Sequence, residues 1–90
     1  MTRILLAAAE ITIPNEVGSA SNVGSATVVR IVNKGSTNRV LTVVESDSTD
    51  VVGSFTVLGN TSELLEKKSG ERIHVGAGTD VLGTKVGYTN

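Results

Sequence analysis

The amino-acid sequence predicts an all-β fold, a small antiparallel β-sandwich or jelly-roll-like barrel of seven to eight short strands. Its 90 residues are enough for one hydrophobic core and too few for two, so we expect one domain spanning residues 1–90. The 14 valines and 11 threonines are β-branched and suit a pleated surface. Short apolar runs alternate with clusters of Gly, Asn, Ser and Asp, which is the pattern of strands and turns.

The N-terminal region divides into an apolar run and a polar loop. The run Arg3–Ile13 ends at Pro14 and predicts either one bent strand or two short ones. Residues 15–25 are rich in Gly and Ser, and the tetrapeptide Val-Gly-Ser-Ala occurs twice, starting at Val17 and at Val23. This composition favours a flexible loop.

The segment Ala26–Asn33 is the clearest strand. Alternation places Val29 and Ile31 on one face. The other face carries three apolar side chains and one arginine, at Ala26, Val28, Val32 and Arg30. A strand that is apolar on both faces is covered on both, and a two-layer sandwich covers only one. We therefore expect a loop or another subunit to cover the face that carries Arg30.

Further segments complete the set of strands. The segment Ser62–Lys68 contains helix-forming residues but is too short for a stable helix, and turns at Gly59 and Gly70 flank it. An edge strand with protective charges is favoured there over a short helix. The other predicted strands are Arg39–Ser46, Val51–Leu58, Arg72–Val75 and Asp80–Thr89.

Two glycines and six apolar residues have predicted structural roles. Gly35, in the turn Lys34–Asn38, is free to take a positive φ. Gly53, inside a strand, indicates a bulge or a close backbone approach. Six residues are expected to be buried between the sheets: Val29, Ile31, Leu41, Val43, Phe55 and Val57.

Composition argues against several classes of function. The net charge is −1, the basic residues form no stripe, and only two aromatic residues are present, so nucleic-acid binding is not expected. No stretch approaches the roughly 20 apolar residues of a membrane span. The chain has no cysteine, which removes disulfides, thiol nucleophiles and thiolate metal sites.

No group of residues has the spacing of a catalytic, cofactor or metal site. His74 is the only histidine, and alternation turns it to solvent with Arg72 while Ile73 and Val75 face inward. The turn with Asp47 and Asp50 lacks the ligand pattern of a calcium loop and is interpreted as solvated. We therefore expect no enzyme activity, no cofactor and no metal.

A small basic cluster and a short glycine motif are the remaining candidates. Lys67 and Lys68 lie near Arg72, and such a run is usually a solvated edge; the alternative is docking on an acidic protein surface. The motif Gly76-Ala77-Gly78 lacks the spacing, the helix and the lysine of a phosphate-binding loop.

Three segments carry a family resemblance. Ala26–Gly35 (ATVVRIVNKG) resembles an "atlvRivNtG" strand and turn, Ser62–Lys68 is similar to an "e-x-hydrophobic-hydrophobic-E-K" segment, and Val86-Gly87-Tyr88 matches a final "V-x-[YF]" strand. These patterns are those of small virion structural proteins of marine tailed phages, which decorate or cement capsids. The loop of residues 15–25 is longer than in that family.

The resemblance implies a location, partners and a contact surface. The chain would be made in the host cytoplasm, bind the major capsid protein on the outer capsid surface and form a homotrimer. We expect two contact elements, the second face around Arg30 and an N-terminal segment that adds to a neighbour's sheet edge: Thr2, Arg3, Ile4, Leu5 and Leu6. The alternatives are a tail or fibre subunit and a small carbohydrate- or ligand-binding β-module. The shortage of aromatic residues disfavours the last of these.

Overall fold

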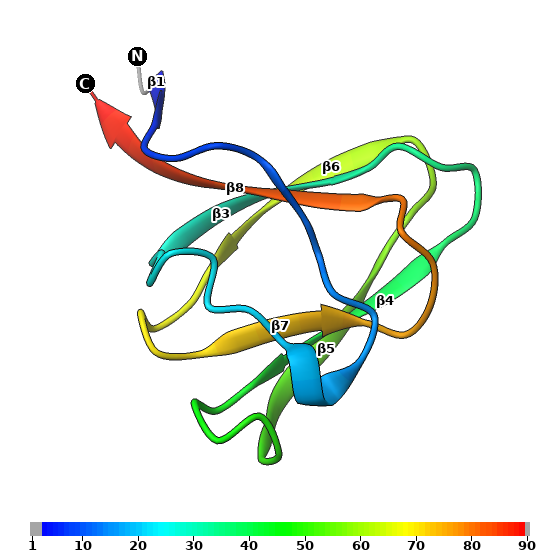
Figure 1. The fold of residues 1–90 in the computed structure, drawn as a ribbon. Coiled ribbons are helices and arrows are strands. Elements are labelled where there is room, and N and C mark those ends of the chain that lie inside the picture. The colour runs from blue at the N-terminus through cyan, green and yellow to red at the C-terminus, as the bar shows by residue number, and fades with distance from the viewer. Residues whose placement is uncertain (1–2, 90) are drawn as a thin grey trace.

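The structure is a computed structural model that describes residues 3–89, and it is an all-β sandwich (Figure 1). Within these residues every strand pairing is antiparallel. One sheet has the strand order β1-β8-β3-β6, with β2 also paired to β8, and the other has the order β5-β4-β7. The elements are β1 (Arg3–Leu6), β2 (Ile11–Thr12), the 3-10 helix η1 (Val17–Ser19), β3 (Val28–Asn33), β4 (Arg39–Val44), β5 (Val51–Val57), β6 (Thr61–Glu66), β7 (Arg72–Val75) and β8 (Val81–Thr89).

The predicted strands are confirmed. The structure also decides between the alternatives for the first apolar run, for the segment that begins at Ser62 and for Gly53. The first apolar run forms two short strands, β1 and β2, which pair with different parts of β8. The segment that begins at Ser62 is a strand at the sheet edge and not a helix. Beside Gly53 the register shifts between Val43 and Val44, which is the predicted bulge. Nothing lies within 4 Å of a Cβ built on Gly53, so close backbone approach is not the reason for this glycine.

The core lies between the two sheets, and one predicted core residue is only partly buried. Five of the six predicted core residues are buried, whereas Phe55 is half-buried and packs against the core from its margin. Phe55 is on the predicted face, but β5 is an edge strand, so no further strand of residues 3–89 covers that flank. The full buried cluster is Ile13, Val23, Ala26, Val29, Ile31, Leu41, Val43, Val57, Ile73, Val75 and Val81.

The prediction of a flexible loop at residues 15–25 was wrong. Ala20 and Val23 are buried there, and Ser21 forms a β-bridge with Ile73. Each copy of the repeated tetrapeptide forms a turn closed by the same hydrogen bond, in which the alanine N–H donates to the carbonyl of the valine three residues before it, at 3.2 Å in both. The first turn is the 3-10 helix η1, whereas the second is left-handed. In each copy the alanine is buried while the Gly-Ser pair is exposed, so the repeat encodes two turns that anchor the loop.

The expected position of Ala26 was also wrong. Its N–H bonds to the carbonyls of Asn22 and Val23, so it belongs to the preceding turn, and its side chain is in the core. The strand starts at Val28, two residues later than expected. A left-handed stretch through Val23, Gly24 and Ser25 redirects the chain there, with φ values of 54°, 63° and 58°.

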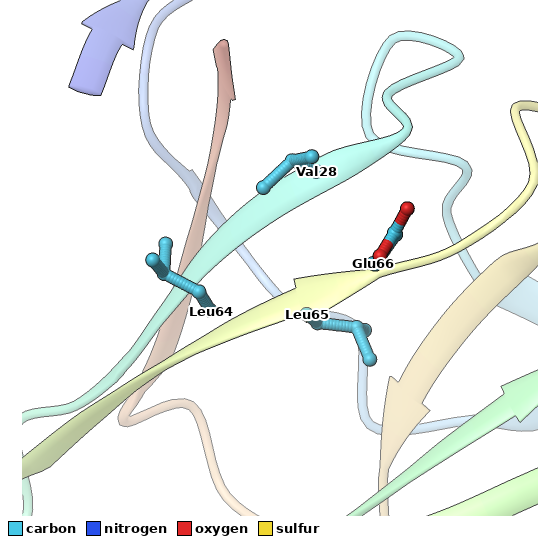
Figure 2. A pocket seen from close by; sticks show the side chains of 4 residues that line it. All are labelled: Val28, Leu64, Leu65 and Glu66. Atoms are coloured by element: carbon cyan, nitrogen blue, oxygen red, sulfur yellow. The ribbon is translucent and has the colours of Figure 1, made fainter. Parts of the chain in front are cut away.

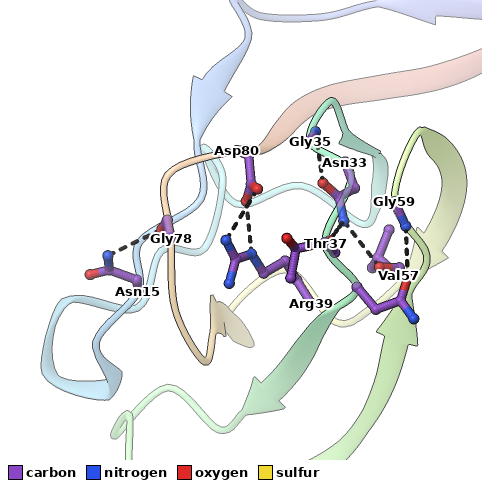
Figure 3. Close-up of polar contacts among 10 residues, drawn as sticks. Asn15, Asn33, Gly35, Thr37, Arg39, Val57, Gly59, Gly78 and Asp80 are labelled. Atoms are coloured by element: carbon purple, nitrogen blue, oxygen red, sulfur yellow. Dashed lines mark hydrogen bonds and ion pairs between the residues drawn. The ribbon is translucent and has the colours of Figure 1, made fainter.

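Gly35 is required for space and does not use its freedom to take a positive φ. Positive-φ glycines among the described residues are Gly24 and Gly78. A Cβ on Gly35 would collide with the carboxylate of Asp80. Asp80 in turn accepts from Arg39, with distances of 3.0 Å from Nε and 3.3 Å from Nη2 (Figure 3).

Candidate protein interface

The outer face of the larger sheet is built from alternate residues of β3, β6 and β8. The register sets Arg30 of β3 between Leu64 of β6 and Thr84 of β8. Residues that lie directly opposite one another in antiparallel strands share a face. The same face therefore includes Val28 beside Glu66 on one side of Arg30. On its other side it includes the row formed by Val32, Ser62 and Leu82.

This outer face is exposed along the β3–β6 pair, whereas its β8 residues Thr84 and Val86 are only 6% and 5% exposed. Leu64 is 47% exposed, and Val28, Val32 and Leu82 are half-buried. Figure 2 shows Val28 on one side of the β3–β6 pair, with Leu65 pointing to the opposite side. Shallow depressions follow the β3–β6 pair, one lined by Val28 and Leu64 and two others lined in part by Arg30. Within residues 3–89 the second face is therefore covered at its β8 end, around Thr84 and Val86, and stays exposed at Leu64.

Arg30 lies half-buried in the middle of this face. Thr84 beside it is only 6% exposed. The ion pair found within residues 3–89 joins Arg39 to Asp80, so Arg30 has no carboxylate partner in the part of the chain that the structure describes. A guanidinium held among apolar side chains, with its fork of donors unpaired, is suited to bind a carboxylate on another molecule.

The N-terminal candidate segment pairs with its own chain. Arg3–Leu6 forms β1 and lies antiparallel to residues 86–89 of β8, and this ribbon projects from the body of the sandwich beside the C-terminal end (Figure 1). Leu5 and Leu6 are 55% and 70% exposed. Thr2 lies outside the described residues, and for Arg3 and Ile4 only the backbone is described. Strand addition to a neighbour stays a prediction, and it requires either the free edge of β1 or its release from β8.

The structure joins the two candidate elements, which sequence reasoning treated separately. Leu6 lies opposite Val86 on β8. Val86 is two residues from Thr84, which is opposite Arg30. Alternation then places Leu6 and Arg30 on the same face of one sheet. The sequence carried no signal for this arrangement, because β8 brings β1 and β3 together only through long-range pairing.

The expected basic cluster does not form, because Lys67 turns inward. It is 6% exposed, and its Nζ donates to the carbonyls of Ala26 at 2.8 Å and Lys68 at 3.2 Å. Burial lowers the pKa of Lys67, while the charge of Glu71 acts in the opposite direction. The prediction of a solvated edge holds for Lys68, which is exposed, and was wrong for Lys67.

The remaining polar candidates, His74, Arg72 and Asp47, lie on strands and turns of the sandwich. His74 and Arg72 are half-buried on the face opposite the buried Ile73 and Val75, as alternation predicted. Backbone hydrogen bonds from Thr49 and Asp50 lower the pKa of Asp47 to about 2. The described residues contain no group of three or more side chains placed to hold a metal ion. In the same part of the chain, no helix has the length and apolarity needed to cross a membrane.

No protein-family model, curated protein or solved structure matches this chain.

Proposed function

We propose that this chain is a non-enzymatic virion structural protein that decorates the outer surface of a phage capsid. The observation that carries the proposal is the exposed outer face of the β3–β6 pair, with Arg30 beside it and without a carboxylate partner within residues 3–89. Such a face is suited to dock a protein surface that offers apolar groups and a carboxylate. The resemblance of the β3 segment to capsid-decorating proteins is the reason for proposing a capsid protein as the partner.

The proposed mechanism is non-covalent bridging of the major capsid protein. The apolar side chains Val28, Val32 and Leu64 would lose their water, and Arg30 would form a bidentate pair with a capsid carboxylate. The exposed Leu6 extends the same face toward a second capsid subunit. Three copies would surround a three-fold position of the shell. Binding that spans two subunits raises the free energy needed to separate them, so the shell resists heat.

The test is binding to purified capsids that lack this protein. Arg30→Glu reverses the charge at the centre of the face, and we expect its affinity to fall by about 100-fold or more, as for loss of a buried charge pair. Arg30→Lys keeps the charge without the fork, and we expect an intermediate affinity. Lys68→Glu is the matched control: it makes the same charge change on an exposed residue that lies in the turn leading to the other sheet.

Co-sedimentation measures occupancy, and heating of the particles measures protection. A form lacking Thr2–Leu6 tests the second contact element in the same assay. Equal occupancy of capsids by the wild type and by Arg30→Glu would remove this face from the mechanism. If the wild type binds no capsid, the decoration proposal fails; electron microscopy of whole particles would then reveal a tail or fibre position.

A further inference from the structure

The edges of the two sheets differ in how well they are protected. In the smaller sheet, β7 is covered by the segment that follows β2. Ser21 and Ile73 exchange backbone hydrogen bonds of 3.0 and 2.8 Å, and the Val75 N–H donates to the Pro14 carbonyl at 2.9 Å. The other edge of this sheet is β5, and no strand within residues 3–89 pairs with its outer side.

The edge strands of the larger sheet have features that prevent pairing with a strand of another molecule. β6 bears Glu63 and Glu66, both exposed, and β1 has only four residues. Short length and charge are two ways in which proteins prevent edge-to-edge pairing. β5 has neither: it is seven residues long, contains no charged residue and no proline, and leaves Val51 67% and Val52 51% exposed. Its bulge lies at Val52, and the register with β4 is regular from Gly53 to Val57.

The sequence of β5 is complementary to itself in antiparallel pairing. If Ser54 lies opposite Ser54 of a second copy, Gly53 lies opposite the second copy's Phe55. Gly53 has open space where a Cβ would be, and Phe55 is half-buried on the same face. An aromatic ring across from a glycine fills the space that the glycine leaves and covers the ring itself.

Charge favours the same antiparallel arrangement. The turn between β4 and β5 carries three carboxylates, those of Glu45, Asp47 and Asp50. The opposite end of the hairpin carries Lys34 and Arg39, with Asp80 as the acidic partner of Arg39. Antiparallel pairing sets the acidic end of each copy beside the more basic end of the other, while parallel pairing would set the two acidic turns together.

We propose that two copies of this chain pair along β5, antiparallel about a two-fold axis through Ser54, so that their three-stranded sheets join into one continuous sheet. The surface is isologous, as two-fold dimers require. The pairing does not depend on the proposed function. On a shell it is compatible with three-fold clusters, because neighbouring three-fold positions of an icosahedral lattice are related by two-fold axes.

A single cysteine at Ser54 tests the contact directly, since the chain has no cysteine of its own. Residues directly opposite across an antiparallel pair have Cβ atoms about 4.5–5.5 Å apart. We expect Ser54→Cys to be cross-linked into a covalent dimer by a short bis-maleimide reagent at micromolar protein concentration. Thr12→Cys is the control, since Thr12 is also exposed but lies on β2, which pairs with the larger sheet; we expect it to stay uncross-linked.

A charge exchange at Ser54 gives a second, reversible readout. Sedimentation of the wild type is expected to show twice the chain mass of 9.3 kDa. Ser54→Lys and Ser54→Glu each place like charges opposite one another, and we expect dimer dissociation constants at least about tenfold higher for each. Mixing the two variants pairs opposite charges and is expected to restore the dimer. Melting curves of the exposed-site variants verify that they are folded.

Three results would overturn the proposal. The first is a wild type that stays monomeric up to millimolar concentration. The second is an assembly, dimer or trimer, that both Ser54 variants leave intact, because another surface would then hold it. The third is a mixture of the two variants that stays monomeric, because Ser54 would then not face itself. Capsid binding is measured separately, so its failure does not alter these outcomes.

Discussion

Asn33 is a buried polar residue whose hydrogen bonds join three segments. Its side-chain amide donates to the carbonyls of Thr37 at 2.8 Å and Val57 at 3.1 Å, and its Oδ1 accepts from the Gly35 N–H at 3.0 Å (Figure 3). It has no exposed surface. A buried amide is tolerated because its partners are in place, and here they fix the turn after β3 against the end of β5.

The Asn33→Ala variant should therefore be less stable. Removing the amide leaves the carbonyl of Val57 and the N–H of Gly35 without these partners, and we expect the free energy of unfolding to fall by about 1–3 kcal/mol. Asn38→Ala is the matched control, because Asn38 accepts a similar bond from the Gly59 N–H but at an exposed site. Urea denaturation measures both. Equal losses in the two variants would show that burial of Asn33 is not what matters.

At the scale of the element, β5 shows why alternation predicts a face but not a degree of burial. Phe55 lies opposite Leu41 on the inner side of the sheet, as predicted. Leu41, on the central strand, has no exposed surface, whereas Phe55 on the edge strand is half-buried. Strand position within the sheet sets this difference, and it arises from pairings between distant parts of the chain.

The same difference predicts the order of two core substitutions. Leu41→Ala should lower the free energy of unfolding by about 2–5 kcal/mol, the range for a buried leucine. Phe55→Ala should cost less than about 3 kcal/mol, below the range for a fully buried phenylalanine, because part of its ring is already in contact with water. Unfolding is measured at low micromolar concentration and also in the Ser54→Lys variant, so that the loss of stability is separated from any effect on dimer formation along β5. A larger loss for Phe55→Ala than for Leu41→Ala would contradict the edge position.

At the scale of the whole molecule, the ion pair between Arg39 and Asp80 connects the two sheets. Arg39 begins β4 in the smaller sheet, and Asp80 immediately precedes β8 in the larger one. Gly35 and Gly78 clear the space around the pair: a Cβ on Gly35 would meet Asp80, and one on Gly78 would lie 2.6 Å from Nη2 of Arg39. Hydrogen bonding from Arg39 is the main reason that the pKa of Asp80 is held below the ordinary aspartate value of 3.8.

This ion pair predicts a pH dependence of stability. Because the pKa of Asp80 is lower in the folded chain than in the unfolded chain, its contribution is fully present above about pH 4 and is lost as the pH falls through the lowered value. Asp80→Asn should therefore lower the melting temperature near neutral pH, and the gap to the wild type should shrink in acid. Melting curves at several pH values measure the gap. A gap that stays constant between neutral and strongly acidic pH would exclude the ionised carboxylate as its source.

The sequence by itself determined the local structure of this protein. The period-two pattern in Val28–Asn33 and Arg72–Val75, and the turn residues between strands, depend on interactions between near neighbours, so the strands and their inward faces could be predicted. The second apolar face around Arg30 could also be predicted, because the strand carries more apolar residues than one core needs; whether that face is covered or open could not. These features require no knowledge of which strand pairs with which.

Only the tertiary structure decided which residues lie at an edge and which reach across the molecule. It left Phe55 half-buried on β5, turned Lys67 inward to the carbonyl of Ala26, and ordered the loop of residues 15–25 against β7. It also put Leu6 on the face of Arg30 through their shared neighbour β8. The physical reason is that these outcomes follow from hydrogen bonds and packing between segments far apart in the chain, and composition and periodicity within a single segment carry no record of them.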